Sequence, residues 1–147
     1  MTDQQGSTFY EATRDVFKMM LGLDIAQLET YSAADGEETV QIAIELIGDL
    51  TGSVVYSFPK TTALNIVKTL SGMESGAIDE FATSMLGEIS NIISGNAVTI
   101  LSSYNCNCDI RPPQITIRNN TAKIDDTVVY LCLQSEVGQL YEHVLLS

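Results

Sequence analysis

Basic residues are scarce in this 147-residue chain, which carries 7 Lys and Arg against 19 Asp and Glu, for a net charge of −12 at pH 7. Such an acidic surface repels phosphate backbones and anionic lipid, which argues against nucleic acid and membrane partners. It suits a partner that presents Lys or Arg around its own site. The chain also lacks a cationic start followed by an apolar run, and no apolar run approaches the roughly 20 residues that span a bilayer. We therefore expect a cytoplasmic protein.

Cysteine and histidine are also rare, with three cysteines (Cys106, Cys108 and Cys132) and a single histidine, His143. An odd cysteine count argues against a secreted disulfide framework. Zinc sites typically use paired C-x2-C units, whereas Cys106 and Cys108 are separated by one residue, so free thiols are expected rather than a metal site. A self-contained hydrolase is disfavoured as well, because His143 lies in a strand-like segment without a recognisable nucleophile or orienting partner.

The remaining composition is that of an ordinary globular protein, with 45% hydrophobic residues, 10 Gly and 3 Pro. The length suits one domain with a real core, so a single domain over residues 1–147 is expected. Hydrophobic spacing predicts a helix over 8–22, and strands in 23–32, 38–48 and 52–58. Helices over 60–72 and about 79–101 follow, and then strands in 108–117, 126–137 and 138–147.

The predicted order, helix, three strands, two helices, three strands, indicates an internal duplication of a helix and three strands. We therefore expect one α+β fold with a pseudo-two-fold axis, its helices packed on an antiparallel or mixed sheet. Setting Gly22 against Gly95 aligns the first helix with the long one. In this alignment the two helices do not share their polar residues.

The segment SMLGEISNIISGNA, residues 84–97, carries polar and small residues on one side of the predicted long helix. With Ser84 at zero and about 100° per residue, Glu88 lies near 40°, Asn91 near −20°, Gly87 near −60° and Gly95 near 20°. The opposite side is apolar and predicts a buried stripe, made of Ala82, Met85, Ile89, Ile92 and Ile93.

Two interpretations of this helix face are open on spacing alone. Glu88 and Asn91 are either ordinary solvated residues or parts of a binding site. A glycine inside a helix costs about 1 kcal/mol relative to alanine, so Gly87 and Gly95 need a reason. Close approach by another backbone or a ligand supplies one, and packing within the domain supplies the other.

The signature of the CheC/CheX family of chemotaxis phosphatases resembles the spacing of Ser84, Glu88 and Asn91. Pro113 follows Asn91 at one residue less than the distance that is usual in this signature. The segments NIISGNAVTIL and FYEATRDVFKMMLGLDI are also similar to that family, so the resemblance covers essentially the whole chain. The first helix has no E-x-x-N motif, which points to the single-site CheX branch. The resemblance implies a CheC-like fold.

The resemblance also implies a function, namely removal of the phosphoryl group from a CheY-type response regulator. It implies that Glu88 contacts a lysine of the regulator and that Asn91 orients the attacking water. Ser84, Gly87, Gly95 and Pro113 are the expected partner-binding positions. It further implies a homodimer built through sheet edges, and Mg²⁺ on the regulator, with no metal or other cofactor held by this chain.

The implied chemistry suits these residue types, because phosphoryl transfer depends on positioning and electrostatics, and an amide can orient a water without titrating. A non-catalytic alternative remains, in which the same fold docks a receiver domain or a flagellar or chemotaxis protein without hydrolysis.

Overall fold

The structure of the protein is a computed structural model that describes residues 2–28, 37–74, 76–118 and 129–147. The first half contains helix α1 (Thr2–Leu21), strands β1 (Ala26–Leu28), β2 (Thr39–Gly48) and β3 (Gly52–Pro59), and helix α2 (Lys60–Ser71). The second half contains helix α3 (Glu80–Ser102) and strands β4 (Cys108–Ile110), β5 (Gln114–Arg118), β6 (Val129–Ser135) and β7 (Gly138–Leu146). The predicted order of helices and strands is confirmed, except that four strands rather than three follow α3 among the described residues.

Two of the predicted strands differ in extent from the sequence expectation. The strand expected over 108–117 is divided into β4 and β5 at Pro112 and Pro113, because proline has no N–H to donate to a sheet. The strand expected over 23–32 contains β1, which spans Ala26–Leu28. Residues 29–32 of the predicted range lie outside the described residues.

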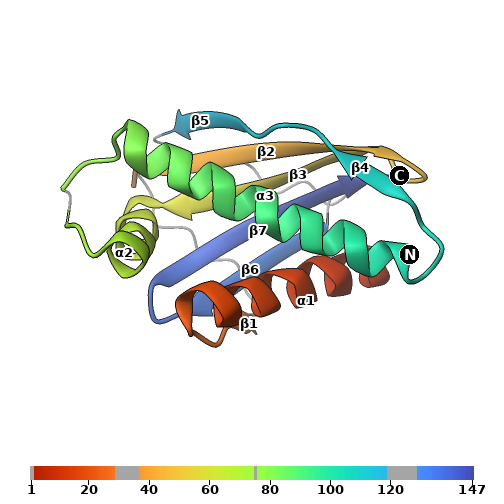
Figure 1. Ribbon diagram of the computed structural model, residues 1–147, viewed down its shortest axis with the longest axis horizontal. Coiled ribbons are helices and arrows are strands. Elements are labelled where there is room, and N and C mark those ends of the chain that lie inside the picture. Colours follow the sequence, from red (N-terminus) through yellow and green to blue (C-terminus); the bar gives the residue numbers. More distant parts are fainter. Residues whose placement is uncertain (1, 29–36, 75, 119–128) are drawn as a thin grey trace.

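The strands form one sheet in the order β1-β6-β7-β3-β2-β4, with β5 also paired to β2 (Figure 1). All pairings between the described strands are antiparallel. The order is symmetric about the central pair β3–β7, since β2 and β6 flank this pair, and β4 with β5 at one edge corresponds to β1 at the other. This symmetry supports the predicted duplication.

The alignment of Gly22 with Gly95 is wrong, however. Gly22 ends α1 in a left-handed conformation with φ +69°. Gly95 lies inside α3, which continues to Ser102. The two glycines therefore do not occupy equivalent positions in the two halves.

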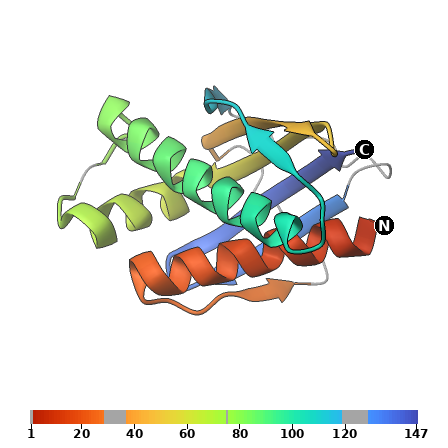
Figure 2. The ribbon, with the colours of Figure 1, turned by 45° about the vertical axis from the view of Figure 1, so that its right-hand side comes forward.

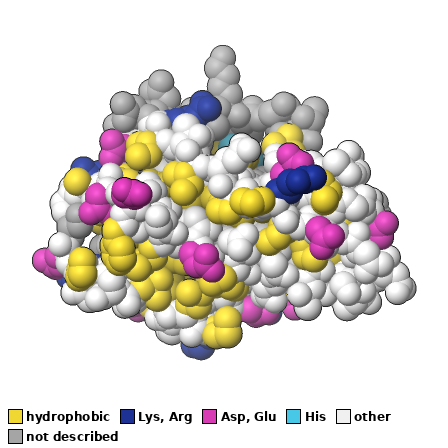
Figure 3. All heavy atoms as spheres, turned by 45° about the horizontal axis from the view of Figure 1, so that its top comes forward, with side chains coloured by type: hydrophobic (Ala, Val, Ile, Leu, Met, Phe, Trp, Pro, Cys, Tyr) yellow, Lys and Arg dark blue, Asp and Glu magenta, His cyan; other side chains and the backbone are white. Residues whose placement is uncertain are grey.

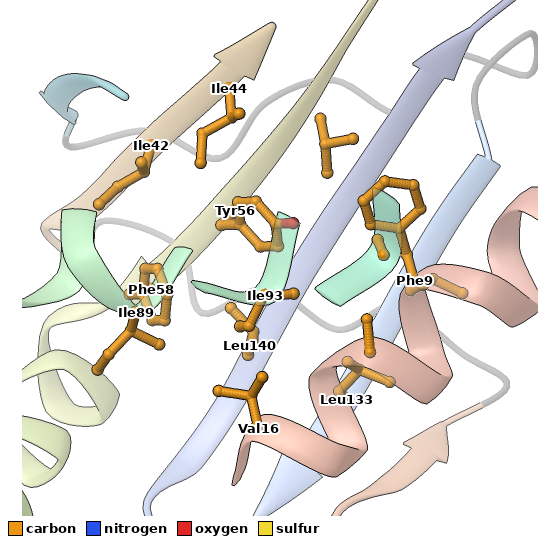
Figure 4. Packing of buried hydrophobic residues seen from close by; sticks show 14 of the residues in the cluster. Phe9, Val16, Ile42, Ile44, Tyr56, Phe58, Ile89, Ile93, Leu133 and Leu140 are labelled. Carbon is orange, nitrogen blue, oxygen red and sulfur yellow. The ribbon is translucent and has the colours of Figure 1, made fainter. Parts of the chain in front are cut away.

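The three helices of the described residues cover one face of the sheet, and the core lies between the two layers (Figures 1 and 2). Strand β2 buries every second residue on the side of the helices, as its alternation predicted: Val40, Ile42, Ile44 and Leu46. Figure 4 shows Phe9 and Val16 of α1 and Ile89 and Ile93 of α3 packed onto this face. Full burial of a side chain of this size contributes about 1.5–3 kcal/mol, so this contact holds α3 firmly against the sheet.

Two polar contacts cross the apolar core. The Tyr56 hydroxyl of β3 lies 2.8 Å from the Ser94 hydroxyl of α3. Glu142 of β7 is fully buried and lies 2.5 Å from the hydroxyl of Thr13 in α1. Burial raises the pKa of Glu142 to about 8, and the hydrogen bond with Thr13 opposes that rise. Each contact joins a helix to a central strand of the sheet.

Candidate functional site

Helix α3 carries the candidate site, and local sequence determines where this helix begins. Asp79 is the N-cap, and its carboxylate accepts a hydrogen bond of 2.8 Å from the backbone N–H of Ala82. Glu80 adds an acidic residue in the first turn, where the helix dipole favours negative charge. The N-cap and the acidic first turn therefore define where the helix begins.

The side of α3 that is buried against the sheet determines which residues are exposed on its outer side. The inner face is made of apolar and small residues that pack on the sheet, including Leu86, Ile89, Ser90, Ile93, Ser94 and Ala97, all buried. Ser90 satisfies its hydroxyl by donating to the Leu86 carbonyl at 2.9 Å. With this side against the sheet, Ser84 and Glu88 are exposed and Asn91 is partly exposed on the outer side.

Glu88 and Asn91 are one turn apart on this outer face. Neither side chain forms a hydrogen bond or an ion pair with any residue that the structure describes. An ionised carboxylate accepts hydrogen bonds only, whereas an amide both donates and accepts. The pair therefore offers a negative charge and an uncommitted amide side by side on a rigid helix, and no described segment crosses this face (Figures 1 and 2).

The two glycines of the motif have different surroundings. A Cβ at Gly87 would lie 3.4 Å from Ile115 Cδ1 and 3.7 Å from Pro113 Cγ, and Gly87 is buried. A Cβ at Gly95 would meet nothing within 4 Å. Packing within the fold therefore accounts for Gly87, while the surface at Gly95 is open to whatever approaches the outer face of α3.

Pro113 comes to this helix from the segment between β4 and β5. The backbone N–H of Arg111 donates to the Glu45 carbonyl at 2.9 Å, and Gln114 then pairs with Ala43 of β2. These contacts hold the intervening prolines at the edge of the sheet. Pro113 then lies beside Gly87, which directly precedes Glu88 in α3. The structure thus brings Pro113 together with the helical part of the motif.

Sequence reasoning missed Ile115 and Phe81 as neighbours of this site. Ile115 follows Pro113 by two residues and covers Gly87. Phe81, in the first turn of α3, is exposed despite being a large aromatic residue. The alternating segment QITIR carried a signal for Ile115, because its two isoleucines share one face of the strand.

Metal and membrane features were searched over the part of the chain that the structure describes. Within it, no three His, Cys, Asp or Glu side chains are placed to hold a metal ion. Cys106 is half-buried and Cys108 is buried. None of the described helices is both long and apolar enough to cross a membrane.

Known proteins resemble this chain in sequence and in structure. Residues 40–133 match the family described as Chemotaxis phosphatase CheX. The protein described as CheY-P phosphatase CheX from Thermotoga maritima is 33% identical over 109 residues, which cover 72% of this chain and 68% of the relative. Chemotaxis protein CheX from Vibrio vulnificus has a TM-score of 0.82 at 20% identity, covering 100% of this chain and 99% of that one. The CheX–CheY–BeF3–Mg²⁺ complex from Borrelia burgdorferi contains a chain with a TM-score of 0.73 at 24% identity, covering 95% of this chain and 96% of that one.

Proposed function

Because the chain belongs to the chemotaxis phosphatase CheX family, we propose that it hydrolyses the aspartyl phosphate of a CheY-type response regulator. The relative from Thermotoga maritima is described as a phosphatase of CheY-P. The structure from Borrelia burgdorferi holds CheX with CheY, BeF3 and Mg²⁺. Both relatives support a phosphorylated regulator as the substrate.

In this reaction a water oxygen attacks phosphorus, and the bond from phosphorus to the regulator's carboxylate oxygen breaks. Inorganic phosphate and a free aspartate leave, and the protons of the water pass to phosphate and solvent. Asn91 orients the water by accepting one hydrogen bond and donating another, without titrating itself. Glu88 binds a lysine of the regulator and so places Asn91 over the phosphate.

One observation carries this proposal. Glu88 and Asn91 lie on the outer face of α3 without a hydrogen bond or ion pair to any described residue, while the other side of this helix is buried in the core. Positioning of this kind is what phosphoryl transfer needs, since its loose transition state leaves little covalent chemistry to the protein. Mg²⁺ belongs to the regulator in this scheme, where it neutralises charge on the phosphoryl oxygens. This chain then supplies no metal ligand.

The other motif positions have supporting parts in the proposal. Ser84 and Gly95 lie along the same outer face as Glu88 and Asn91, where a partner backbone approaches. Pro113 packs beside Gly87 and supports α3 from the edge of the sheet. A homodimer joined through sheet edges is part of the proposal too, and the cytoplasmic location expected from the sequence stays a prediction.

The direct test is phosphate release from purified phosphorylated single-domain regulators, with Mg²⁺ present and with or without the protein. Asn91→Ala should lower the stimulated rate by about 100-fold or more, because the water loses its orienting group, while the Kd for a BeF3-activated regulator stays within about threefold. Asn107→Ala, in an exposed position in the loop after α3, is the matched control and should leave both values unchanged.

Two outcomes would contradict the proposal. If regulator phosphate decays equally fast with and without the wild-type protein, it is not a phosphatase for that regulator class. Tight binding of the activated regulator without faster decay would instead identify a non-catalytic docking module.

A further inference from the structure

Three large hydrophobic side chains are exposed around the N-terminal half of α3: Phe81 at 47%, Ile115 at 42% and Ile117 at 46%. Figure 3, which brings the β5 side of the molecule forward, shows hydrophobic side chains exposed in patches between acidic ones. An edge strand usually carries charged residues or proline on its exposed positions, which limits unwanted association. Two half-exposed isoleucines on β5 therefore indicate a surface that another molecule covers.

The pairing of β5 with β2 shows which way these isoleucines point. Ile115 lies opposite Ile42 and Ile117 opposite Val40, and both β2 residues are fully buried under the helices. Directly opposed residues of an antiparallel pair project to the same side of the sheet. Ile115 and Ile117 thus project to the side that carries α3, as the contact between Ile115 and Gly87 also shows.

Phe81 extends this surface along α3. It precedes Glu88 by seven residues, which is about two turns, so both side chains project from the same side of the helix. Glu80 and Glu88 are the charged residues of α3, which contains no Lys, Arg or His. The polar row of Ser84, Glu88 and Asn91 is therefore bordered by apolar side chains and carries acidic charge only.

We propose that Phe81, Ile115 and Ile117 form an apolar strip that docks the phosphorylated regulator beside the Glu88–Asn91 pair, and this proposal rests on the proposed phosphatase function. The occupant is the part of the regulator around its aspartyl phosphate, where the proposed function places a lysine opposite Glu88. The apolar strip borders Glu88, so apolar contact and charge complementarity act on the same surface.

The apolar strip contributes to binding rather than to the chemical step. Its contacts with the regulator are the same before and during attack by water, because they lie outside the reacting atoms. Interactions of this uniform kind lower KM and leave kcat unchanged. This separates the apolar strip from Asn91, whose loss lowers kcat.

The test is the triple variant Phe81→Gln, Ile115→Thr and Ile117→Thr, which keeps a helix former in α3 and β-branched residues in β5. Leu145→Thr is the matched control, because Leu145 is 44% exposed and lies on the other side of the sheet from the helices. KM and kcat are measured with the phosphorylated regulator, Kd with the BeF3–Mg²⁺ form, and the oligomeric state by sedimentation. If the triple variant does not fold, Ile117→Thr alone takes its place.

We expect KM and Kd of the triple variant to rise about tenfold or more, with kcat within about twofold and the control unchanged. Equal KM and Kd in variant and control would overturn the inference. Dissociation to a smaller species that binds the regulator with unchanged Kd would also overturn it, because the occupant would then be a second copy of this chain. A wild-type protein that binds the regulator but does not speed its decay would refute the phosphatase function alone, since the Kd comparison still tests the strip.

Discussion

Glu142 makes the stability of this protein depend on pH in a direction that can be measured. The burial of this side chain raises its pKa from 4.5 to about 8, so the folded protein holds the carboxyl neutral at pH 7. The folded state then binds more protons than the unfolded state between about pH 4.5 and pH 8. The contribution of Glu142 to the free energy of unfolding therefore falls as the pH rises through this window.

The surroundings of Glu142 agree with a neutral carboxyl. The Thr13 hydroxyl lies 2.8 Å from the Phe9 carbonyl oxygen and 2.5 Å from Glu142 Oε2. A hydroxyl has one proton, and the carbonyl oxygen can only accept. The single Thr13 proton is therefore shared between the Phe9 carbonyl oxygen and Glu142 Oε2, while the buried Glu142 Oε1 has no hydrogen-bond partner among the described residues. An ionised Glu142 would have to compete with Phe9 for the proton of Thr13.

The difference between pKa values of 4.5 and about 8 corresponds to about 5 kcal/mol, at 1.36 kcal/mol for each unit. About 3 kcal/mol of this penalty is already present at pH 7, a large share of the 5–15 kcal/mol that stabilises an ordinary domain. Glu142→Gln keeps the shape and an oxygen acceptor for Thr13 but removes the titration.

The assay is urea unfolding of wild type and Glu142→Gln at several pH values from 4 to 9. The free energy of unfolding of the variant minus that of wild type should increase by about 5 kcal/mol across this range. All other titrating groups are common to both proteins and cancel in this difference. A difference that stays constant with pH would refute the reasoning, because Glu142 would then have the same pKa in the folded and unfolded states.

The remaining predictions concern the outer face of α3. Gly95→Ala should raise the free energy of unfolding by about 0.5–1 kcal/mol, because the added Cβ meets nothing, and thermal unfolding checks this. Gly87→Leu should instead lower it by about 1–3 kcal/mol, because the larger side chain must displace Ile115 and Pro113; equal stability of the two variants would contradict the packing described. Glu88→Lys should weaken regulator binding more than Glu88→Ala, since two cations would face each other, and near-equal Kd values would count against a lysine contact. The wild-type association rate should also fall as salt is added, which stopped-flow mixing with the regulator would measure.

The sequence predicted the parts of this structure that depend on local pattern. Alternation along β2 identified its buried face, and helical spacing separated the apolar side of α3 from Glu88 and Asn91. Alternation also carried a signal for Glu142, which is in phase with the buried Leu140 and Val144. The sequence prediction for that segment is a strand alone, and it does not include the buried carboxyl.

What the sequence could not predict depends on contacts between distant residues. Ser94 looks like a neutral polar residue in a helix, and only the fold brings it to Tyr56. Gly87 could not be told apart from Gly95 by helical position, because their difference comes from Ile115 on another strand. The roles of the site residues stay a prediction, since they depend on a partner molecule.

The two polar contacts through the core share a feature with the contacts of α2: each joins one half of the duplication to the other. Thr13 with Glu142 and Tyr56 with Ser94 cross between the halves, and so do the bonds from Thr62 to the Gln139 carbonyl and from Asn65 to the Val137 carbonyl. The halves are thus joined as two subunits of a heterodimer would be, with matched polar groups across an apolar interface. A chain cut in the connection between α2 and α3 would have to re-form these bonds between two molecules, and its stability would then depend on protein concentration.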